Sequence, residues 1–266
     1  MVRAGYECSR ATTTIGFHLL RSIDATSTVV GGPYDADMNT DTDVWAGVRA
    51  QVEELARTPG AKEVLGAASH GFELLDPLTT EELAELEGQV GVRLPEGYRE
   101  FLLRVGAGGA GPAHGLFPVV KEADGRWRWR GDGARLTALE RLAEPFPVAG
   151  VDSTVLTALR AREPVEEDAR DVEEFDTAYQ AWDERMGELL WAEERTVGAI
   201  CLCHMGCAIR RWLVVSGPGA GQVWHDGRVD DEDLRPLRGK DGAPLHFTEW
   251  YLGWLREASH SAAARS

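Results

Sequence analysis

The spacing of hydrophobic and polar positions predicts two consecutive helices in the first half of the chain. Residues 79–91 begin with a Thr79-x-x-Glu82 capping box, in which each side chain satisfies a backbone amide of the first turn. The next helix starts at Pro95, because proline lacks the amide hydrogen that a first turn leaves unpaired, and Gly106 would end it in a left-handed conformation. The two apolar faces are Leu83, Leu86 and Val90, and then Tyr98, Phe101, Leu102 and Val105.

Two further helices are expected near the ends of the chain. A leading helix falls within residues 38–57, where Asp41 or Thr42 can cap the first turn. Its apolar positions are Val44, Val48, Val52 and Leu55. The apolar segment "FTEWYLGWLREA", residues 247–258, predicts a closing helix.

Short alternating segments predict strands. Trp127 and Trp129 alternate with arginines, and we expect them in the core of the protein rather than at an interface with a partner. The segment "SGPGAG", residues 216–221, separates two apolar runs and predicts a hairpin connection. The expected strands cover residues 115–120, 126–131, 198–204, 209–216 and 221–226. Strands framed by helices predict an α+β protein.

An acidic helical insertion is expected at about residues 160–195. Residues 163–194 hold thirteen acidic residues against Arg170 and Arg185, which is most of the formal net charge of −16. Within them, residues 172–192 predict a long amphipathic helix with its acids outward. The predicted inward positions are Phe175, Tyr179, Trp182, Met186, Leu189 and Leu190.

The strong negative charge disfavours two classes of partner. An acidic protein repels the phosphates of nucleic acid and the anionic face of a membrane, whereas it attracts cationic partners. No apolar run approaches the roughly 20 residues that a membrane span requires. The N-terminal segment "TIGFHLLRSI" lacks the pattern of a signal peptide. These features predict a cytoplasmic protein that binds neither nucleic acid nor membranes directly.

The chain is expected to form one main domain. Residues 1–37 lack sustained periodicity and are predicted to be a flexible extension, so that the functional chain would begin near Met38. The domain would then cover residues 38–260 and include the acidic insertion. Residues 261–266 are expected to form a flexible tail.

Three of the four cysteines and one histidine fall in Cys201-x-Cys203-His204-x-x-Cys207. A tetrahedral cysteine site in a protein usually needs two ligand pairs, and only one cluster is present. We interpret the segment as a strand with buried thiols that bends or bulges at Gly206. Neither a metal nor a cofactor is therefore expected. Unpaired thiols of this kind also favour a reducing compartment.

Catalytic arrangements remain as alternatives. His204 beside Cys203 and Cys207 could form a thiol–imidazole pair, and His225-Asp226 could form a polarised histidine. The segment "GAGGAG", residues 106–111, matches a dinucleotide-binding pattern, but a helix rather than a strand is predicted to precede it. We therefore expect a protein that is not an enzyme, with a Cys/His-dependent or metal-binding enzyme as the less favoured alternative.

Taken in order, the predicted elements resemble the SMI1/KNR4 (SUKH) family. The similarity rests on the stretch from Leu78 to Gly109, on "WLVVSGPGAGQVWHDGR" and on "FTEWYLGWL". The residues that carry it are Gly91, Leu94, Pro95, Tyr98, Phe101, Gly108, Gly109, Gly217 and Trp224. The resemblance implies a twisted, mainly antiparallel sheet flanked by helices, here with the acidic helical insertion.

The resemblance also implies that the protein acts by binding other proteins. Many bacterial members look like immunity proteins that neutralise toxins, often nucleases, whereas fungal members are intracellular regulators. A regulatory scaffold is therefore the alternative function. An acidic inhibitor would complement the basic face of a nuclease toxin. The expected contact residues are Glu166, Glu167, Asp168, Asp171, Glu173, Glu174 and Asp176, with the "DDED" run at 230–233 second, although these acids could instead serve only to solvate the surface.

Overall fold

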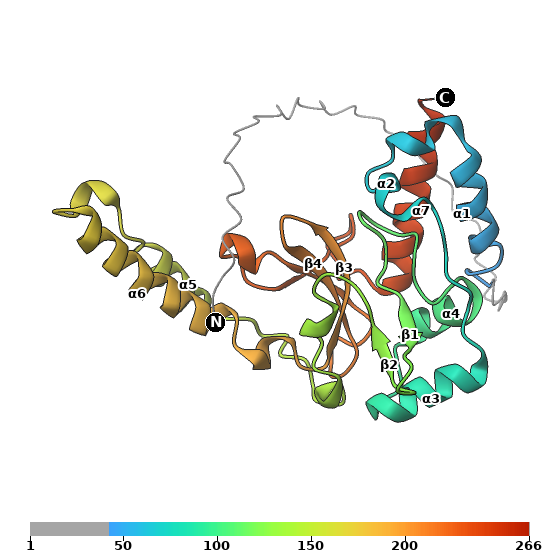
Figure 1. The fold of residues 1–266 in the computed structure, drawn as a ribbon, viewed down its shortest axis with the longest axis horizontal. Coiled ribbons are helices and arrows are strands. Elements are labelled where there is room, and N and C mark those ends of the chain that lie inside the picture. The colour runs from blue at the N-terminus through green and yellow to red at the C-terminus, as the bar shows by residue number, and fades with distance from the viewer. Residues whose placement is uncertain (1–42, 266) are drawn as a thin grey trace, which may run out of the picture. The chain divides into compact units, whose positions relative to one another are not determined.

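The computed structural model describes residues 43–265 (Figure 1). The extension predicted over residues 1–37 and the predicted start of the domain at Met38 lie outside the described residues. No helix in the described part of the chain is both long enough and apolar enough to cross a membrane. From Trp45 onward the chain forms one unit, and the elements below belong to it.

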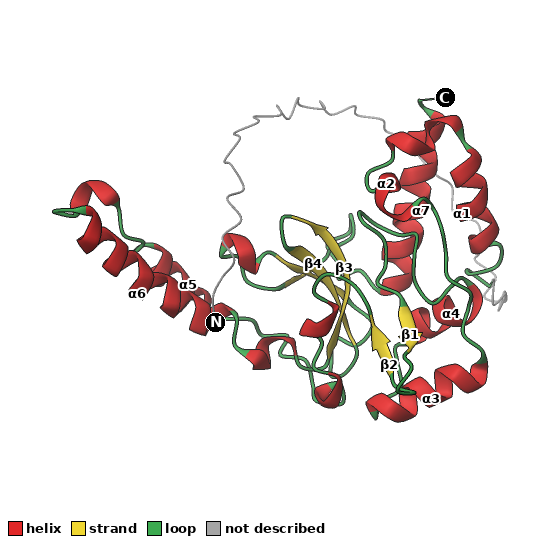
Figure 2. Cartoon of the chain, viewed as in Figure 1, coloured by secondary structure: helices red, strands yellow, loops and turns green. Residues whose placement is uncertain are grey.

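A group of helices covers one side of the strands (Figure 2). These helices are α1 (Val48–Arg57), α2 (Ala67–His70), α3 (Thr80–Val90), α4 (Glu96–Arg104) and α7 (Phe247–Ala263). Aromatic rings connect α4, α7 and the turn before α1. The ring centroids of Phe101 and Tyr251 lie 4.8 Å apart, and that of Trp45 lies 5.8 Å from Phe101 and 6.2 Å from Phe247. Contacts of this kind add to the stabilisation that burial already gives.

The local signals for α3 and α4 are confirmed, with one exception. Thr79 and Glu82 form the predicted capping box, and Gly91 ends α3 in the left-handed region at φ 70°. Gly106 does not end α4 in that conformation, because Val105 occupies the C-cap in a right-handed conformation. Gly106 is instead a site of close approach, where an added Cβ would lie 2.6 Å from the carbonyl oxygen of Leu75.

Two antiparallel sheets confirm the α+β fold. In the first, β1 (Val119–Lys121) pairs with β2 (Trp127–Trp129), and both tryptophans of β2 are buried, as predicted. The second sheet has the order β3-β4-β5-β6. Its strands are β3 (Ala199–Gly206), β4 (Ile209–Val214), β5 (Val223–Asp226) and β6 (Arg235–Pro236). The sequence pattern missed β6, since two residues are too few to show an alternation.

The strand β3 is irregular, as its glycine suggested. Register shifts occur between Cys201 and Cys203 and again between His204 and Gly206. The first shift places Leu202 opposite no residue of β4, and all three positions from Cys201 to Cys203 are buried. The bulges therefore remove the simple alternation of faces that an unbroken strand would have.

The first and last helices differ from the prediction in their bounds. The first helix starts at Val48 rather than near Thr42, and Val44 is 51% exposed whereas Trp45 is buried. At the other end, α7 continues to Ala263. Because Ala262 is buried, residues 261–263 belong to the closing helix rather than to a tail.

The remaining helices are α5 (Ser153–Arg160) and α6 (Val172–Leu190), which lie side by side and extend away from the four-stranded sheet (Figure 1). Short 3-10 turns connect the elements: η1 (Pro59–Glu63), η2 (Ala134–Leu136), η3 (Leu139–Arg141), η4 (Glu166–Asp168), η5 (Glu193–Thr196) and η6 (Arg228–Asp230). The main core joins the helical layer to both sheets, and α5 and α6 contribute no buried residue to it.

Candidate partner-binding site

Residues 151–194, here called the acidic arm, form a helical hairpin around α5 and α6. Each helix begins with an aspartate cap: Asp152 accepts from the amide of Thr154 at 2.8 Å, and Asp171 accepts from the amide of Glu174 at 2.9 Å. The backbone hydrogen bonds at Asp152 hold the pKa of its carboxyl below its ordinary value. The acidic arm therefore starts before residue 160, where the insertion is predicted to begin, because α5 packs against α6.

The acidic arm has a small hydrophobic core of its own. The buried members are Leu156, Trp182, Met186 and Leu190. The indole nitrogen of Trp182 donates to the carbonyl oxygen of Leu159 at 2.9 Å, which fixes α6 against the end of α5. None of these residues belongs to the main core, so the arm packs as a separate cluster.

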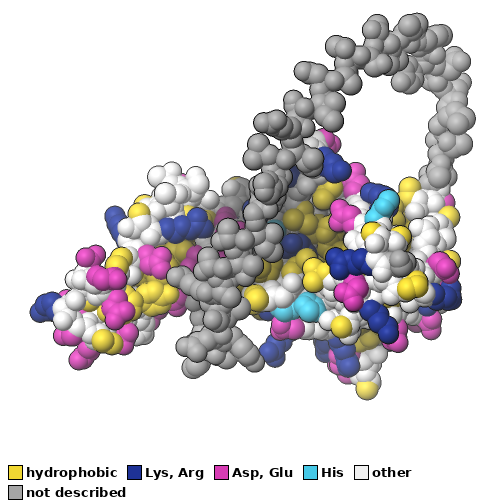
Figure 3. All heavy atoms as spheres, turned by 90° about the horizontal axis from the view of Figure 1, so that it is seen from above, with side chains coloured by type: hydrophobic (Ala, Val, Ile, Leu, Met, Phe, Trp, Pro, Cys, Tyr) yellow, Lys and Arg dark blue, Asp and Glu magenta, His cyan; other side chains and the backbone are white. Residues whose placement is uncertain are grey.

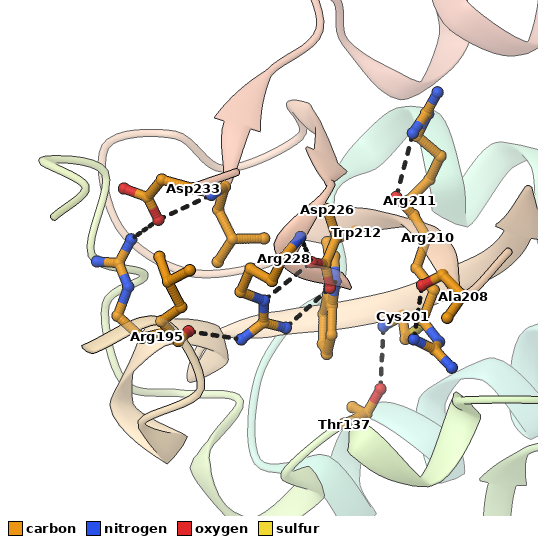
Figure 4. A network of polar contacts seen from close by, with 12 residues as sticks. Thr137, Arg195, Cys201, Ala208, Arg210, Arg211, Trp212, Asp226, Arg228 and Asp233 are labelled. Atoms are coloured by element: carbon orange, nitrogen blue, oxygen red, sulfur yellow. Dashed lines mark hydrogen bonds and ion pairs between the residues drawn. The ribbon is translucent and has the colours of Figure 1, made fainter. Parts of the chain in front are cut away.

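A buried ion pair attaches the acidic arm to the sheet. Nε and Nη2 of Arg228 donate to Asp226 at 2.9 and 2.8 Å, and Nη1 donates to the carbonyl oxygen of Leu190 at 3.2 Å (Figure 4). The guanidinium also lies 4.3 Å from the ring centre of Trp191. Burial opposes ionisation of Asp226, but the hydrogen bonds from Arg228 and Trp212 outweigh it and hold the pKa of Asp226 below its ordinary value.

A second ion pair fixes the two ends of the arm. Arg195 pairs with Asp233, whose other carboxylate oxygen accepts from the amide of Val151 at 2.6 Å. Asp233 is the last residue of the "DDED" run that we considered as a secondary contact surface. Its half-buried carboxylate is occupied within the protein, so this member of the run is structural.

The acids predicted to contact a partner all lie on the acidic arm, but they are not equivalent. Glu166, Glu167 and Asp168 form the exposed turn η4 between the helices. Glu173 and Asp176 are exposed on α6. Asp171 caps α6, and Glu174 forms a 2.9 Å ion pair with Arg170. Five of the seven carboxylates therefore face solvent without a capping or ion-pairing role among the described contacts.

Exposed apolar side chains lie between these acids, and the sequence reasoning missed them. Val172 is 63% exposed, Val165 52%, Val155 49% and Tyr179 40%. Figure 3 shows hydrophobic and acidic side chains interspersed on the lobe at its left, which is the acidic arm. Charged groups that surround exposed apolar groups are typical of a protein-binding surface.

The inward face predicted for the long helix is confirmed only over its second half. Trp182, Met186 and Leu190 are buried, whereas Tyr179 is exposed and Phe175 is half-buried. The rings of Phe175, Tyr179 and Trp182 follow one another at 5.8 and 5.4 Å. The short α5 covers only part of α6, so the first half of the aromatic stripe remains open to solvent.

Two of the three clustered cysteines are buried. Cys201 and Cys203 are buried and Cys207 is exposed, and none of the three forms a disulfide. Burial raises the pKa of the Cys201 thiol far above its ordinary value and that of Cys203 to about 12, so both stay protonated. Within residues 43–265, no group of three or more His, Cys, Asp or Glu side chains is arranged to hold a metal ion.

The histidines considered for catalysis and their neighbours have other contacts as well. The sulfur of Cys203 lies 3.8 Å from that of Met205, and Nε2 of His204 accepts from the amide of Ala208 at 3.2 Å. Asp226 pairs with Arg228 instead of polarising His225. Nδ1 of His225 contacts the guanidinium of Arg211.

The residues that carry the family resemblance have structural roles. Leu94 and Phe101 are buried in the main core, Pro95 is the N-cap of α4, and Tyr98 accepts a 2.8 Å hydrogen bond from the indole of Trp129. The remaining members are glycines with positive φ at turns or close approaches, and one buried tryptophan: Gly91, Gly108, Gly109, Gly217 and Trp224.

Comparison with known protein families agrees with this structural pattern. The model of the SMI1 / KNR4 family (SUKH-1) matches residues 77–232, which is more than half of the chain. The match starts before α3 and includes the acidic arm and the strands from β1 to β5. No curated protein and no solved structure matches the chain. The chain therefore belongs to the SMI1/KNR4 (SUKH-1) family.

Proposed function

We propose that this protein is a non-enzymatic immunity protein of the cytoplasm that neutralises a bacterial toxin by direct binding through the acidic arm. The observation that carries the proposal is the surface of the arm, where solvent-facing carboxylates surround exposed valines and an exposed tyrosine. Family membership supports a protein-binding role, and the burial of Cys201 and Cys203 argues against catalysis by these two thiols.

The charge of the arm favours a toxin with a basic face, such as a nuclease. A nuclease needs positive potential to hold phosphates, and an acidic surface can occupy the same region. Complementary charge mainly accelerates encounter, whereas the apolar contacts that become buried slow dissociation. Val172 and Tyr179 on α6 would supply such contacts beside Glu173 and Asp176.

The first test is rescue of a poisoned cell. A toxin domain encoded beside the gene for this protein is expressed in cells with and without the protein, and survival is counted. Rescue by the unaltered protein supports immunity. If no adjacent toxin is neutralised and the protein instead associates with regulatory proteins of its host, the proposal is wrong and the scaffold alternative holds.

A charge-reversal pair then tests the surface. Glu166, Glu167 and Glu173 are replaced by Lys in one variant, and the control replaces the exposed Glu73, Glu140 and Glu257, so that both variants gain the same net charge. The arm variant should bind the toxin with an association rate lower by about tenfold and with a weaker salt dependence. Equal rates for the two variants would place the binding surface elsewhere.

A further inference from the structure

Two arginines and a histidine form a row across the four-stranded sheet. Arg211 of β4 pairs in register with His225 of β5, which pairs with Arg235 of β6. Residues directly opposite one another in an antiparallel sheet project from the same face. The three side chains therefore share one face of the sheet.

Arg211 is exceptional among the cations of residues 43–265. Its side chain is half-buried, yet no carboxylate oxygen of the described residues lies within 4.0 Å of its guanidinium. Every other arginine or lysine in this range that lacks such a described partner is exposed. Its Nη1 donates to the carbonyl oxygen of Arg210 at 3.2 Å, and its Nε is buried without a partner. Figure 4 shows Arg211 pointing away from the Asp226–Arg228 pair. Arg211 is thus a half-buried cation without a counter-ion among the described residues, although the chain is strongly acidic.

Two described carboxylates lie near the row that Arg211 forms with His225 and Arg235. Asp226 is already occupied by Arg228 and Trp212. Glu232 lies 3.8 Å from Nε2 of His225 and 3.4 Å from Nη2 of Arg235, and its side chain is 51% exposed. The contact with Arg235 is a long hydrogen bond, and the contact with His225 is beyond hydrogen-bond distance. The carboxylate of Glu232 therefore marks a position that attracts an oxyanion, and its own contacts at that position are long.

We propose that Arg211, His225 and Arg235 form a binding site for a small oxyanion, a phosphate or carboxylate group, that displaces Glu232. Because Nδ1 of His225 accepts from Arg211, the neutral ring carries its proton on Nε2 and offers a donor on the side of Glu232. The guanidinium of Arg235 supplies a charged donor at the position of Glu232. Arg211, on the Nδ1 side of the ring, adds positive charge and fixes the tautomer of His225. This site is separate from the surface in the proposed function and does not depend on it.

The test titrates the full chain with inorganic phosphate and, separately, with acetate, at an ionic strength held constant with chloride. Binding is followed by calorimetry and by the NMR signals of the His225 ring. Saturable binding should occur, and Arg235→Gln should raise the dissociation constant by about tenfold, as expected for the loss of a charged hydrogen bond. Arg211→Gln removes a positive charge and the donor that fixes the tautomer of His225, and it should also weaken binding. Arg135→Gln, which removes an exposed arginine elsewhere, should leave binding unchanged. Tighter binding of phosphate than of acetate identifies a phosphate group, and the reverse identifies a carboxylate.

A variant that is expected to strengthen anion binding separates a role in binding from a purely structural role. Glu232→Gln removes the competing carboxylate and should tighten phosphate binding by several-fold, which loss of a merely structural contact would not do. If Arg211→Gln fails to fold, the exposed Arg235 and Glu232 still decide the question. The proposal is wrong if neither anion shows saturable binding, or if Arg235→Gln and Glu232→Gln leave the affinity unchanged.

Discussion

Arg228 donates two hydrogen bonds to Asp226 and a third to the last residue of α6, so one buried side chain joins β5 to the acidic arm. The side chains of this pair are only 4% and 1% exposed. Removing charges from water is costly, and the pair is tolerated because each partner satisfies the other. The attachment of the arm therefore depends on both charges being present.

Replacing one member of this pair should be more harmful than replacing both. Asp226→Asn leaves Arg228 buried without a counter-charge and should lower the free energy of unfolding by about 3–5 kcal/mol. The double variant Asp226→Leu, Arg228→Met removes both charges and should recover much of that loss. Denaturant unfolding of the two variants beside the parent measures the difference, and a double variant less stable than Asp226→Asn would contradict the interpretation.

Stability should also fall in acid through Asp226. Folding lowers the pKa of this carboxyl below the value of about 3.9 in the unfolded chain, so its contribution is present above that pH. The contribution is lost as the pH falls through the folded pKa, since the folded state must then take up a proton. The free energy of unfolding, measured from pH 6 downward, should decline below about pH 4 more steeply in the parent than in Asp226→Asn.

The acidic arm should open without unfolding of the sheet. Trp182→Ala removes the largest side chain of a four-residue core and its hydrogen bond to Leu159, which should cost about 3–5 kcal/mol within the arm. Hydrogen exchange should therefore accelerate in α5 and α6 and stay unchanged in β3 and β4. Val172→Ala, at an exposed position of the same helix, is the control and should not alter exchange in either part.

The hydrogen bond between Tyr98 and Trp129 should stabilise the packing of α4 against β2. Tyr98→Phe leaves the buried indole nitrogen of Trp129 without an acceptor and should lower the free energy of unfolding by about 1–3 kcal/mol. Trp129→Phe made in the Tyr98→Phe background should show coupling, because the hydrogen bond has already been lost. Additive effects of the two changes would mean that this bond contributes nothing.

Thiol labelling should distinguish the three cysteines of β3 and its turn. Cys201 and Cys203 are buried and their pKa values are raised, so they should resist a thiol reagent at neutral pH until the protein unfolds. Cys207 is exposed and should be labelled in the folded protein. Mass spectrometry of the labelled peptides reports each site. Rapid labelling of Cys203 in the folded state would contradict the buried assignment.

Local sequence signals predicted most of the fold. The capping box at Thr79, the proline start of α4 and the strands around Cys201 each depend on neighbours in the sequence, and the structure confirms them. The features that the sequence predicted wrongly depend on tertiary contacts. Gly106 is required by the nearby Leu75 carbonyl rather than by the end of a helix, and Ala262 is buried because α7 packs near the start of the domain, beside Gly60.

The candidate site was harder to predict than the fold. Composition located the acids, but it could not show that Asp171 and Glu174 have local partners while Glu166 and Glu173 do not. The exposure of Tyr179 follows from the shortness of α5, which periodicity within α6 cannot reveal. The isolation of Arg211 likewise depends on a register across β4, β5 and β6.

The separation of the two hydrophobic clusters has a consequence for substitutions in the acidic arm. Substitutions on the outer surface of α6 alter no side chain that the β-sheet needs for folding. The outer surface of α6 can therefore change one residue at a time while the sheet keeps its stability. A fixed buried salt bridge at the base then presents each new version of the hairpin from the same place on the protein.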